Sequence, residues 1–178
     1  MKYCDLLNKL DSWILKPLGR DIKYYKSRNQ FISFIILSIV IDNLASIRYK
    51  EEIPDKIRGA VGMRYKKFIE NYMPREYKIH KDHLYVDFRC KIIHVFQLKY
   101  FDLQQSKLSE KYHLEIMPSG DICLNSKCFY KDVYKAYGKL RRDLTGKTAA
   151  PEYGPLSHTE IRKEGNNIIL PEKRNIKY

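Results

Sequence analysis

The residues of this chain best suited to chemistry are Arg89 and His94, which stand five positions apart in a largely apolar stretch. An arginine side chain stays protonated at any working pH, whereas a histidine side chain titrates near neutrality. The guanidinium can hold a phosphodiester while the imidazole moves its protons, without a metal ion or cofactor. The pair therefore points to a metal-independent site that cuts RNA. Structural hydrogen bonds at a helix interface are the other role open to these two residues.

Cleavage at such a site would be a transesterification. His94 would take the proton from the ribose 2′-hydroxyl as general base, or protonate the 5′-oxygen leaving group as general acid. Arg89 would bind the non-bridging phosphate oxygens and stabilise the charge that builds on them in the transition state. Lys91, which stands between them in the sequence, is expected to steer the phosphate. The products would carry a 2′,3′-cyclic phosphate, and DNA would not be cut because it lacks the attacking hydroxyl.

The helix that carries the Arg/His pair is expected to run from about residue 81 to about residue 100. Drawn as a wheel at about 100° per residue, this helix has two apolar arcs. The first arc faces the core of the chain and holds Tyr85, Phe88, Ile92, Val95 and Phe96. The second arc lies between Arg89 and His94 and holds Val86, Cys90 and Ile93.

The second apolar arc needs a partner to cover it. A second copy of the same helix, packed about a two-fold axis, would bring two Arg89 and two His94 side chains to the rim of one shared cleft. Val86, Cys90 and Ile93 would then form the interface of a homodimer. The same three side chains could instead pack on the hairpin or the C-terminal arm of their own chain.

Apolar periodicity predicts a mainly helical protein with four to five helices. Besides the Arg/His helix, it indicates helices at about 6–19, 29–50, 55–72 and 129–144. Gly19 is predicted to cap the first of them. The segment at about 112–125 carries two short apolar runs on either side of a Pro-Ser-Gly turn, which predicts a β-hairpin before the last helix. Residues 1–144 are expected to form the helical domain, and residues 145–178 a tail or wrapping arm.

The formal net charge of +13 over 178 residues suggests a polyanionic partner, RNA first. A lysine-rich surface on an ordinary soluble protein would give the same sum. Basic residues gather near the end of the last helix beside several tyrosines, which could stack on bases while the cations bind phosphate. The candidate RNA contacts in this helix are Lys139, Arg141 and Arg142.

The cysteine, histidine and apolar patterns favour a cytoplasmic protein without a metal site. The four cysteines follow no disulfide or metal-ligand spacing. His80 and His83 stand three apart, but no further ligands at a familiar spacing complete a metal site. The start of the chain lacks a secretory pattern. The apolar run at 31–41 is too short to cross a bilayer core of about 30 Å, so it predicts a buried helix rather than a membrane span.

Arg89, four intervening residues and His94, late in a chain of four or five helices, resemble the R-x4–6-H signature of the HEPN superfamily. Three further features are similar to bacterial HEPN-like proteins. These are the segment 41–45 (Ile-Asp-Asn-Leu-Ala), the Phe-Arg-Cys sequence before His94, and a hairpin that leads into a final amphipathic helix. The resemblance covers about residues 25–144.

This resemblance implies a compact helical bundle that dimerises with its Arg/His helices facing one another. Many HEPN domains are metal-independent endoribonucleases in toxin–antitoxin, phage-defence or RNA-processing systems, and Arg89 and His94 would be the catalytic pair here. Active members often carry Asn, Asp or His directly after the arginine, where this chain has Cys90. The alternative is a catalytically inactive HEPN module that binds RNA, or an antitoxin or nucleotidyltransferase partner. A general nucleic-acid-binding protein, with salt-sensitive binding to DNA and RNA alike, is a third possibility.

Overall fold

The computed structural model describes residues 2–24, 30–94, 98 and 100–146. The longer helices are α1 (Lys2–Leu10), α2 (Lys16–Tyr24), α3 (Gln30–Tyr49), α4 (Ala60–Tyr72) and α8 (Ser126–Thr145). The shorter helices are α5 (Arg75–Ile79), α6 (Lys81–His83), α7 (Lys91–His94), two π-helices, η1 (Asp11–Leu15) and η2 (Leu84–Cys90), and the 3₁₀-helix η3 (Lys107–Tyr112). The strands are β1 (Phe101–Gln104) and β2 (Ile122–Asn125). The predicted mainly helical fold is confirmed, and nearly all of the predicted tail lies outside the described residues.

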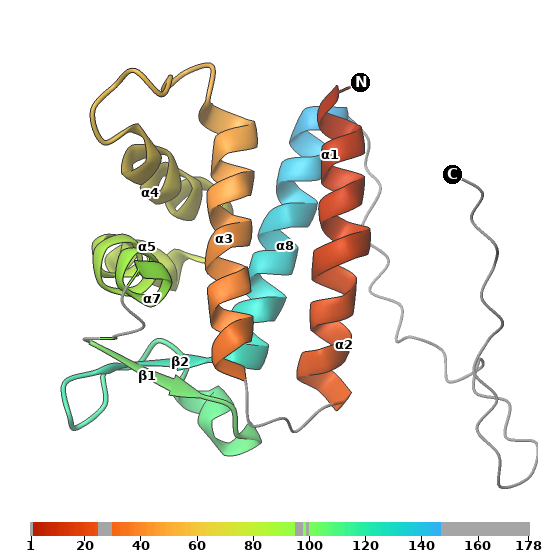
Figure 1. Ribbon diagram of the computed structural model, residues 1–178. Helices are drawn as coiled ribbons and strands as arrows, with labels where there is room; N and C mark the ends of the chain where they lie inside the picture. Colours follow the sequence, from red (N-terminus) through yellow and green to blue (C-terminus); the bar gives the residue numbers. More distant parts are fainter. Residues whose placement is uncertain (1, 25–29, 95–97, 99, 147–178) are drawn as a thin grey trace, which may run out of the picture.

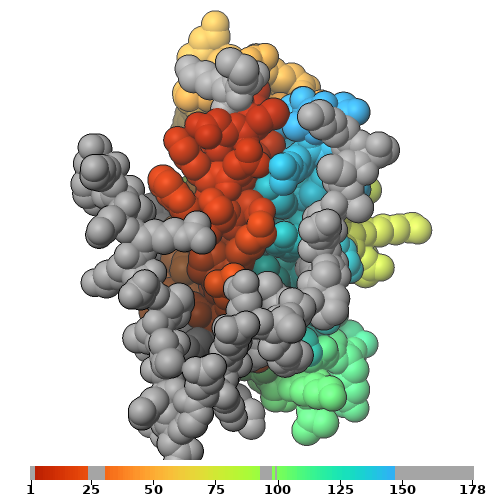
Figure 2. All heavy atoms as spheres, turned by 90° about the vertical axis from the view of Figure 1, so that its right-hand side faces the viewer, coloured from red at the N-terminus to blue at the C-terminus, as the bar shows by residue number. Residues whose placement is uncertain are grey.

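Helix α8 packs between α3 and the rod formed by α1, η1 and α2 (Figure 1). Helix α4 and the short helices α5 to α7 cover the other side of α3, and the two strands lie below them (Figure 1). Viewed from the side, the rod of α1 and α2 runs beside α8 along one face of the molecule (Figure 2). The two longest helices, α3 and α8, are therefore the centre on which the other elements pack.

The N-terminal helix continues through Gly19, so the predicted cap at this residue is wrong. The backbone N–H of Lys16 donates to the carbonyl of Asp11, which widens the helix by one residue just before Pro17. A proline ring crowds the carbonyl four residues earlier and offers no N–H, and the wider turn relieves that conflict. A Cβ atom at Gly19 would lie 2.2 Å from the hydroxyl oxygen of Tyr130. Glycine is needed there for close packing against α8.

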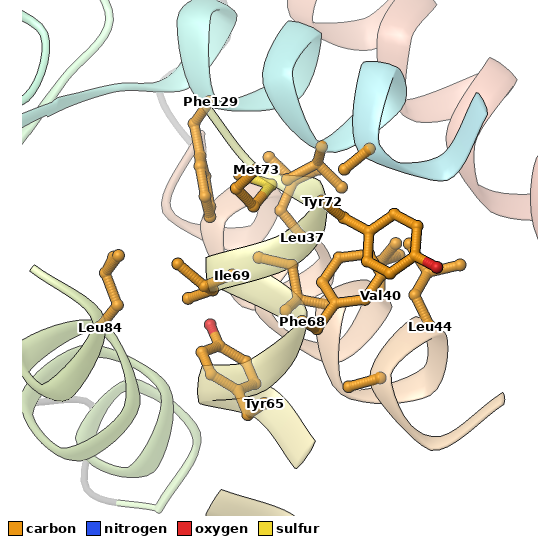
Figure 3. Close-up of a cluster of buried hydrophobic side chains, with 14 of the residues drawn as sticks. Leu37, Val40, Leu44, Tyr65, Phe68, Ile69, Tyr72, Met73, Leu84 and Phe129 are labelled. Carbon is orange, nitrogen blue, oxygen red and sulfur yellow. The ribbon is translucent and has the colours of Figure 1, made fainter. Parts of the chain in front are cut away.

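The core lies where α3, α4, η2 and α8 meet. Figure 3 shows apolar side chains of α4 lying between those of α3 and Leu84 of η2. Four aromatic rings join the helices further along: Phe34 stacks on Phe129 with ring centres 6.2 Å apart, and the edges of both rings meet Phe88. Tyr77 stacks on the Phe129 ring from α5. These contacts fix η2, and therefore its charged side chains, against α3 and α8.

Helix α3 is buried along one side only. Its extent, Gln30–Tyr49, confirms the helix predicted at about 29–50. Ile32 and Ile39 are 52% and 41% exposed, so an apolar stripe remains on its outer face. By length and composition, residues 31–49 could also cross a membrane, with 44% of that stretch buried inside the protein. The buried core helix of a globular protein has the same length and composition.

Strand β2 pairs in parallel with β1, from Phe101 opposite Ile122 to Gln104 opposite Asn125. The predicted hairpin at 112–125 is therefore formed only in part. A tight turn joins Met117 to Asp121, and a single antiparallel bridge links Ile116 to Ile122. Most of its expected first strand is the end of η3 and a loop. The pairing of β2 with β1 prevails over the local hairpin, because in this pairing all four residues of β2 are buried.

The helix predicted at 55–72 begins five residues later, at Ala60. Gly59 has a φ of +78°, which prevents a regular helix from passing through it. The preceding residues form turns, and Asp55 pairs there with Arg64 of α4 at 2.8 Å. The predicted last helix at 129–144 is confirmed and begins three residues earlier, where the side chain of Asn125 accepts hydrogen bonds from the first backbone N–H groups.

Candidate active site

Arg89 is paired with Asp42, a residue 47 positions earlier in the chain. Nε of Arg89, on η2, donates to Oδ2 of Asp42, on α3, over 2.6 Å, and Nη2 forms an ion pair with the same oxygen. The third guanidinium nitrogen, Nη1, is not part of this pairing. The side chains are 19% and 17% exposed, so the pair lies at the edge of the protein rather than inside it.

Burial and pairing act in opposite directions on the charges of this pair. Burial raises the pKa of the Asp42 carboxyl, while the hydrogen bond and positive charge of Arg89 lower it; the net shift is upward. Burial would lower the pKa of Arg89, but its bond to Asp42 raises it above the ordinary value. Arg89 therefore remains fully charged at any working pH. A cation of fixed charge suits phosphate binding better than proton transfer.

Arg89 also contacts the ring of Tyr85. The guanidinium carbon of Arg89 lies 5.9 Å from the centre of the Tyr85 ring, within the range of a cation–π contact. Tyr85 in turn packs on the buried ring of Tyr65, with ring centres 5.5 Å apart. A Cβ atom at Gly62 of α4 would lie 2.5 Å from the Tyr85 ring. Gly62 thus gives Tyr85 the space it needs, and Tyr85 helps to fix Arg89.

Arg89 and Lys91 do not share a face of the helix. They are two positions apart, which is about 200° around the axis at α-helical spacing. Arg89 turns to Asp42, whereas Nζ of Lys91 pairs with Oδ1 of Asp87 at 2.5 Å. The other oxygen of Asp87 lies 2.9 Å from Nδ1 of His83. Lys91 and Arg89 therefore bind two different carboxylates.

The predicted interface residues are described only in part. Val86 is 51% exposed, and Cys90, next to Arg89, is half-buried. The side chains of Ile93 and His94 lie outside the described residues, although both belong to the backbone of α7. Val86 thus lies on the surface as a dimer interface would require. The position of the His94 imidazole relative to Arg89 stays a prediction.

The basic residues predicted to bind RNA on α8 do not share one direction. Nζ of Lys139 donates to the carbonyl of Asn71 at 2.6 Å, at the end of α4. Nη1 of Arg141 lies 3.4 Å from the hydroxyl of Tyr137, a residue buried against α1. Arg142 is half-buried on the outer side of α8. Lys139 and Arg142 remain candidates for an anion site, whereas Arg141 is turned toward the N-terminal rod.

A second histidine cluster was missed by sequence reasoning. The backbone N–H of Asn125 donates to Nδ1 of His113 over 3.0 Å. Nε2 of the neutral ring then carries the proton and faces the hydroxyl of Tyr77 at 2.8 Å, and that hydroxyl donates to Oδ2 of Asp132 over 3.2 Å. Burial lowers the pKa of His113 to about 4, although Asp132 opposes the shift. The ring is neutral and fully bonded, so it has a structural role.

The described residues offer no metal site. No group of three His, Cys, Asp or Glu side chains within the described ranges could hold an ion. Of the two histidines noted in the sequence, His83 binds Asp87 and packs its ring against Tyr100, with ring centres 5.2 Å apart. Burial lowers the pKa of His80. A hydrogen bond between His80 and the backbone of Leu114 opposes this shift, so each histidine has a protein partner.

Asp42 and Tyr85 are the supporting residues that the sequence did not identify as part of the site. Asp42 lies in the segment 41–45 that resembles HEPN-like proteins, but nothing in the local pattern connects it to Arg89. Searches of protein-family models, curated proteins and solved structures find no match to this chain.

Proposed function

We propose that this chain is a metal-independent endoribonuclease of the HEPN type that acts as a homodimer. The observation that carries the proposal is the geometry of Arg89. This guanidinium is held by Asp42 and Tyr85 at the edge of the protein, with Nη1 outside the Asp42 pairing. A fixed, partly desolvated guanidinium is suited to binding a phosphodiester and stabilising the charge of its transition state.

In the proposed reaction, His94 removes the proton of the ribose 2′-hydroxyl, and the 2′-oxygen attacks phosphorus. The bond from phosphorus to the 5′-oxygen breaks, and that oxygen takes up a proton from an imidazolium. Arg89 binds the non-bridging oxygens throughout. The products are a 2′,3′-cyclic phosphate and a free 5′-hydroxyl. The imidazolium formed on His94 can supply that proton, so one His94 and one Arg89, from the same chain or from two copies, balance the proton transfer and the charge.

An exposed apolar surface next to Arg89 supports the dimer. Val86 on η2 is half-exposed, and the outer side of α3 carries Ile32 and Ile39 at 52% and 41% exposure, with Ile36 half-buried between them. Asp42 lies one turn beyond Ile39 on this same helix. An apolar stripe that continues into a charged pair is typical of a protein interface. A second copy covering it would bring the two Arg89 side chains toward a common cleft.

The rival proposal is a HEPN module without catalysis that binds RNA, or an antitoxin or nucleotidyltransferase partner. Two observations favour it: Asp42 neutralises much of the Arg89 charge, and Cys90 follows Arg89 where active relatives in the superfamily often carry a polar residue. In either role we expect a cytoplasmic protein tied to growth control or phage defence.

The direct test incubates the full chain with mixed RNA in EDTA, beside Arg89→Ala, His94→Ala and the control Arg58→Ala. Arg58 is exposed and lies in the turns before α4, so its loss removes one positive charge away from Arg89. Cleavage by wild type and control, lost in both site variants and leaving cyclic phosphate ends, is the expected result. Equal cutting by all four proteins would identify a contaminant and overturn the proposal. RNA binding without any cleavage would favour the rival.

A further inference from the structure

Five cations share the outer face of α8. On a wheel at about 100° per residue, they fall within an arc of about 120°. They are Lys127, Lys131, Lys135, Lys139 and Arg142. We call this set the α8 basic row. The four lysines follow one another at intervals of four residues, so successive side chains are about 6 Å apart along the helix axis.

The opposite face of α8 is buried, which directs the basic row to solvent. Phe129, Val133 and Leu140 are fully buried on that opposite face, and Phe129 stacks on Phe34 of α3. Lys135 and Lys139 are exposed, and the other three cations are half-exposed. Helix α8 reaches the surface beside α1 (Figure 2). The row therefore faces away from α3 and from the Asp42–Arg89 pair.

Three carboxylates lie along the row. Glu110 of η3 pairs with Lys127 at 2.7 Å, and Asp132 lies 3.3 Å from Lys135 while also accepting the bond from Tyr77. Asp143 is exposed at the edge of the arc. Within the described ranges, the side chains of Lys131 and Arg142 form no ion pair that would neutralise them.

The N-terminal end of the row is strongly positive. The pKa of Glu110 is lowered by its hydrogen bond to Lys127 and by the charges of Lys127, Lys131 and Lys107, against the opposing effect of burial. Three lysines thus surround one carboxylate. At the other end, Lys139 is fixed by its bond to the Asn71 carbonyl, which holds its ammonium group at the surface. The whole row keeps a positive excess for an outside anion to neutralise.

We infer that the α8 basic row binds the sugar–phosphate backbone of a nucleic acid. From Lys127 to Arg142 the row extends for about 22 Å, and a linear array of cations matches a polymer that carries one charge at each regular step. An anionic membrane fits less well, because no large apolar side chain of α8 is among the exposed ones in the described chain. Helices that lie on membranes need such side chains. The inference stands apart from the cleavage proposal, since it concerns another face.

The test measures binding of the full chain to a short fluorescent 2′-O-methyl RNA, which transesterification cannot cut. The variant Lys131→Gln/Lys135→Gln removes two charges from the row. The control Lys50→Gln/Lys66→Gln removes two surface lysines, which pair with Asp55 and Asp82 away from the row. We expect the row variant to bind about tenfold more weakly and to lower the slope of log K against log salt by about 1.4. The control should change affinity less than about twofold.

Equal losses in the two double variants would overturn the inference, because they would show a response to net charge alone. Unchanged binding by the row variant would overturn it as well. A DNA oligonucleotide should depend on the row in the same way, since its backbone also carries phosphates. Loss of binding to anionic vesicles but not to the oligonucleotide would identify a membrane surface instead. Because the 2′-O-methyl RNA cannot be cut, this measurement does not depend on cleavage, and a failure of the cleavage proposal would leave it intact.

Discussion

Two polar clusters of this protein are each built around an aspartate, but they differ in whether a polar group is left outside the pairing. Around Asp132, the polar atoms of Tyr77 and His113 are all used within the chain. Around Asp42, Arg89 keeps Nη1 outside the pairing and lies at the protein surface. A buried network that satisfies itself stabilises a fold. A cation held firmly but incompletely paired is prepared for a ligand.

The largest expected difference between the clusters is in activity. Arg89→Ala should lower RNA cleavage at least about 100-fold, because the charge that stabilises the transition state is lost. Rates are measured on end-labelled RNA and corrected for the folded fraction, determined by circular dichroism. A matched change at the other cluster, His113→Ala, should leave cleavage per folded molecule within about threefold of wild type. Similar losses of activity in both variants would show that the clusters around Asp42 and Asp132 do not differ in function.

For stability, the larger effect is expected at the cluster around Asp132. His113→Ala removes the partner of a buried tyrosine hydroxyl and of a backbone N–H, and should lower the free energy of unfolding by about 3 kcal/mol. Urea denaturation at neutral pH measures this loss. A change below about 1 kcal/mol would show that the His113 network is dispensable, and would reopen a functional role for it.

The pH dependence of stability should come from the same histidine. The pKa of His113 is lowered in the folded protein to about 4 from 6.5, so the unfolded chain binds the extra proton first as the pH falls. Stability is full above pH 6.5 and declines through the window down to about pH 4, with a loss of about 2 kcal/mol between pH 7 and pH 5. His113→Gln should remove most of this slope. A slope unchanged in that variant would assign it to other groups.

The smallest expected effects come from a comparison of two glycines, each of which leaves space for a tyrosine side chain. Gly62→Ala would push a methyl group into Tyr85, and Gly19→Ala would push one into Tyr130. Both should cost about 1–3 kcal/mol of stability, since overpacking strains a filled core. Only Gly62→Ala should also reduce cleavage per folded molecule, because Tyr85 supports Arg89. Equal activities for the two variants would show that the Tyr85 contact does not position the guanidinium.

The helices were predictable where apolar residues recur at helical spacing over many turns, as at 29–50 and 129–144. The π-helical turns were not, because hydrophobic periodicity does not encode a helical turn that is wider by one residue. Lys91 and Arg89 are two positions apart, which is about 200° on a helical wheel, and the structure pairs Lys91 with Asp87, four residues before it. At Gly19 a local capping signal was overruled by the close approach of Tyr130.

Long-range partners account for most of what sequence reasoning missed. Asp42 meets Arg89 from 47 residues away, and Tyr77 meets His113 from 36. The local signal for a hairpin at 112–125 was real in its turn but lost to the parallel pairing of β2 with β1. Residue types revealed Arg89 as a site candidate because a guanidinium in an apolar stretch needs a partner. Only the fold identified that partner.

The central claim is that Arg89 and His94 from two copies of the chain form one shared RNA-cutting site. Its most direct test mixes the separately inactive Arg89→Ala and His94→Ala proteins, unfolds and refolds them together, and measures cleavage in EDTA. A mixed dimer retains one intact arginine and one intact histidine on different chains, so a shared cleft predicts that activity reappears in the mixture. Active wild-type protein with a mixture as inactive as its components would contradict the shared site.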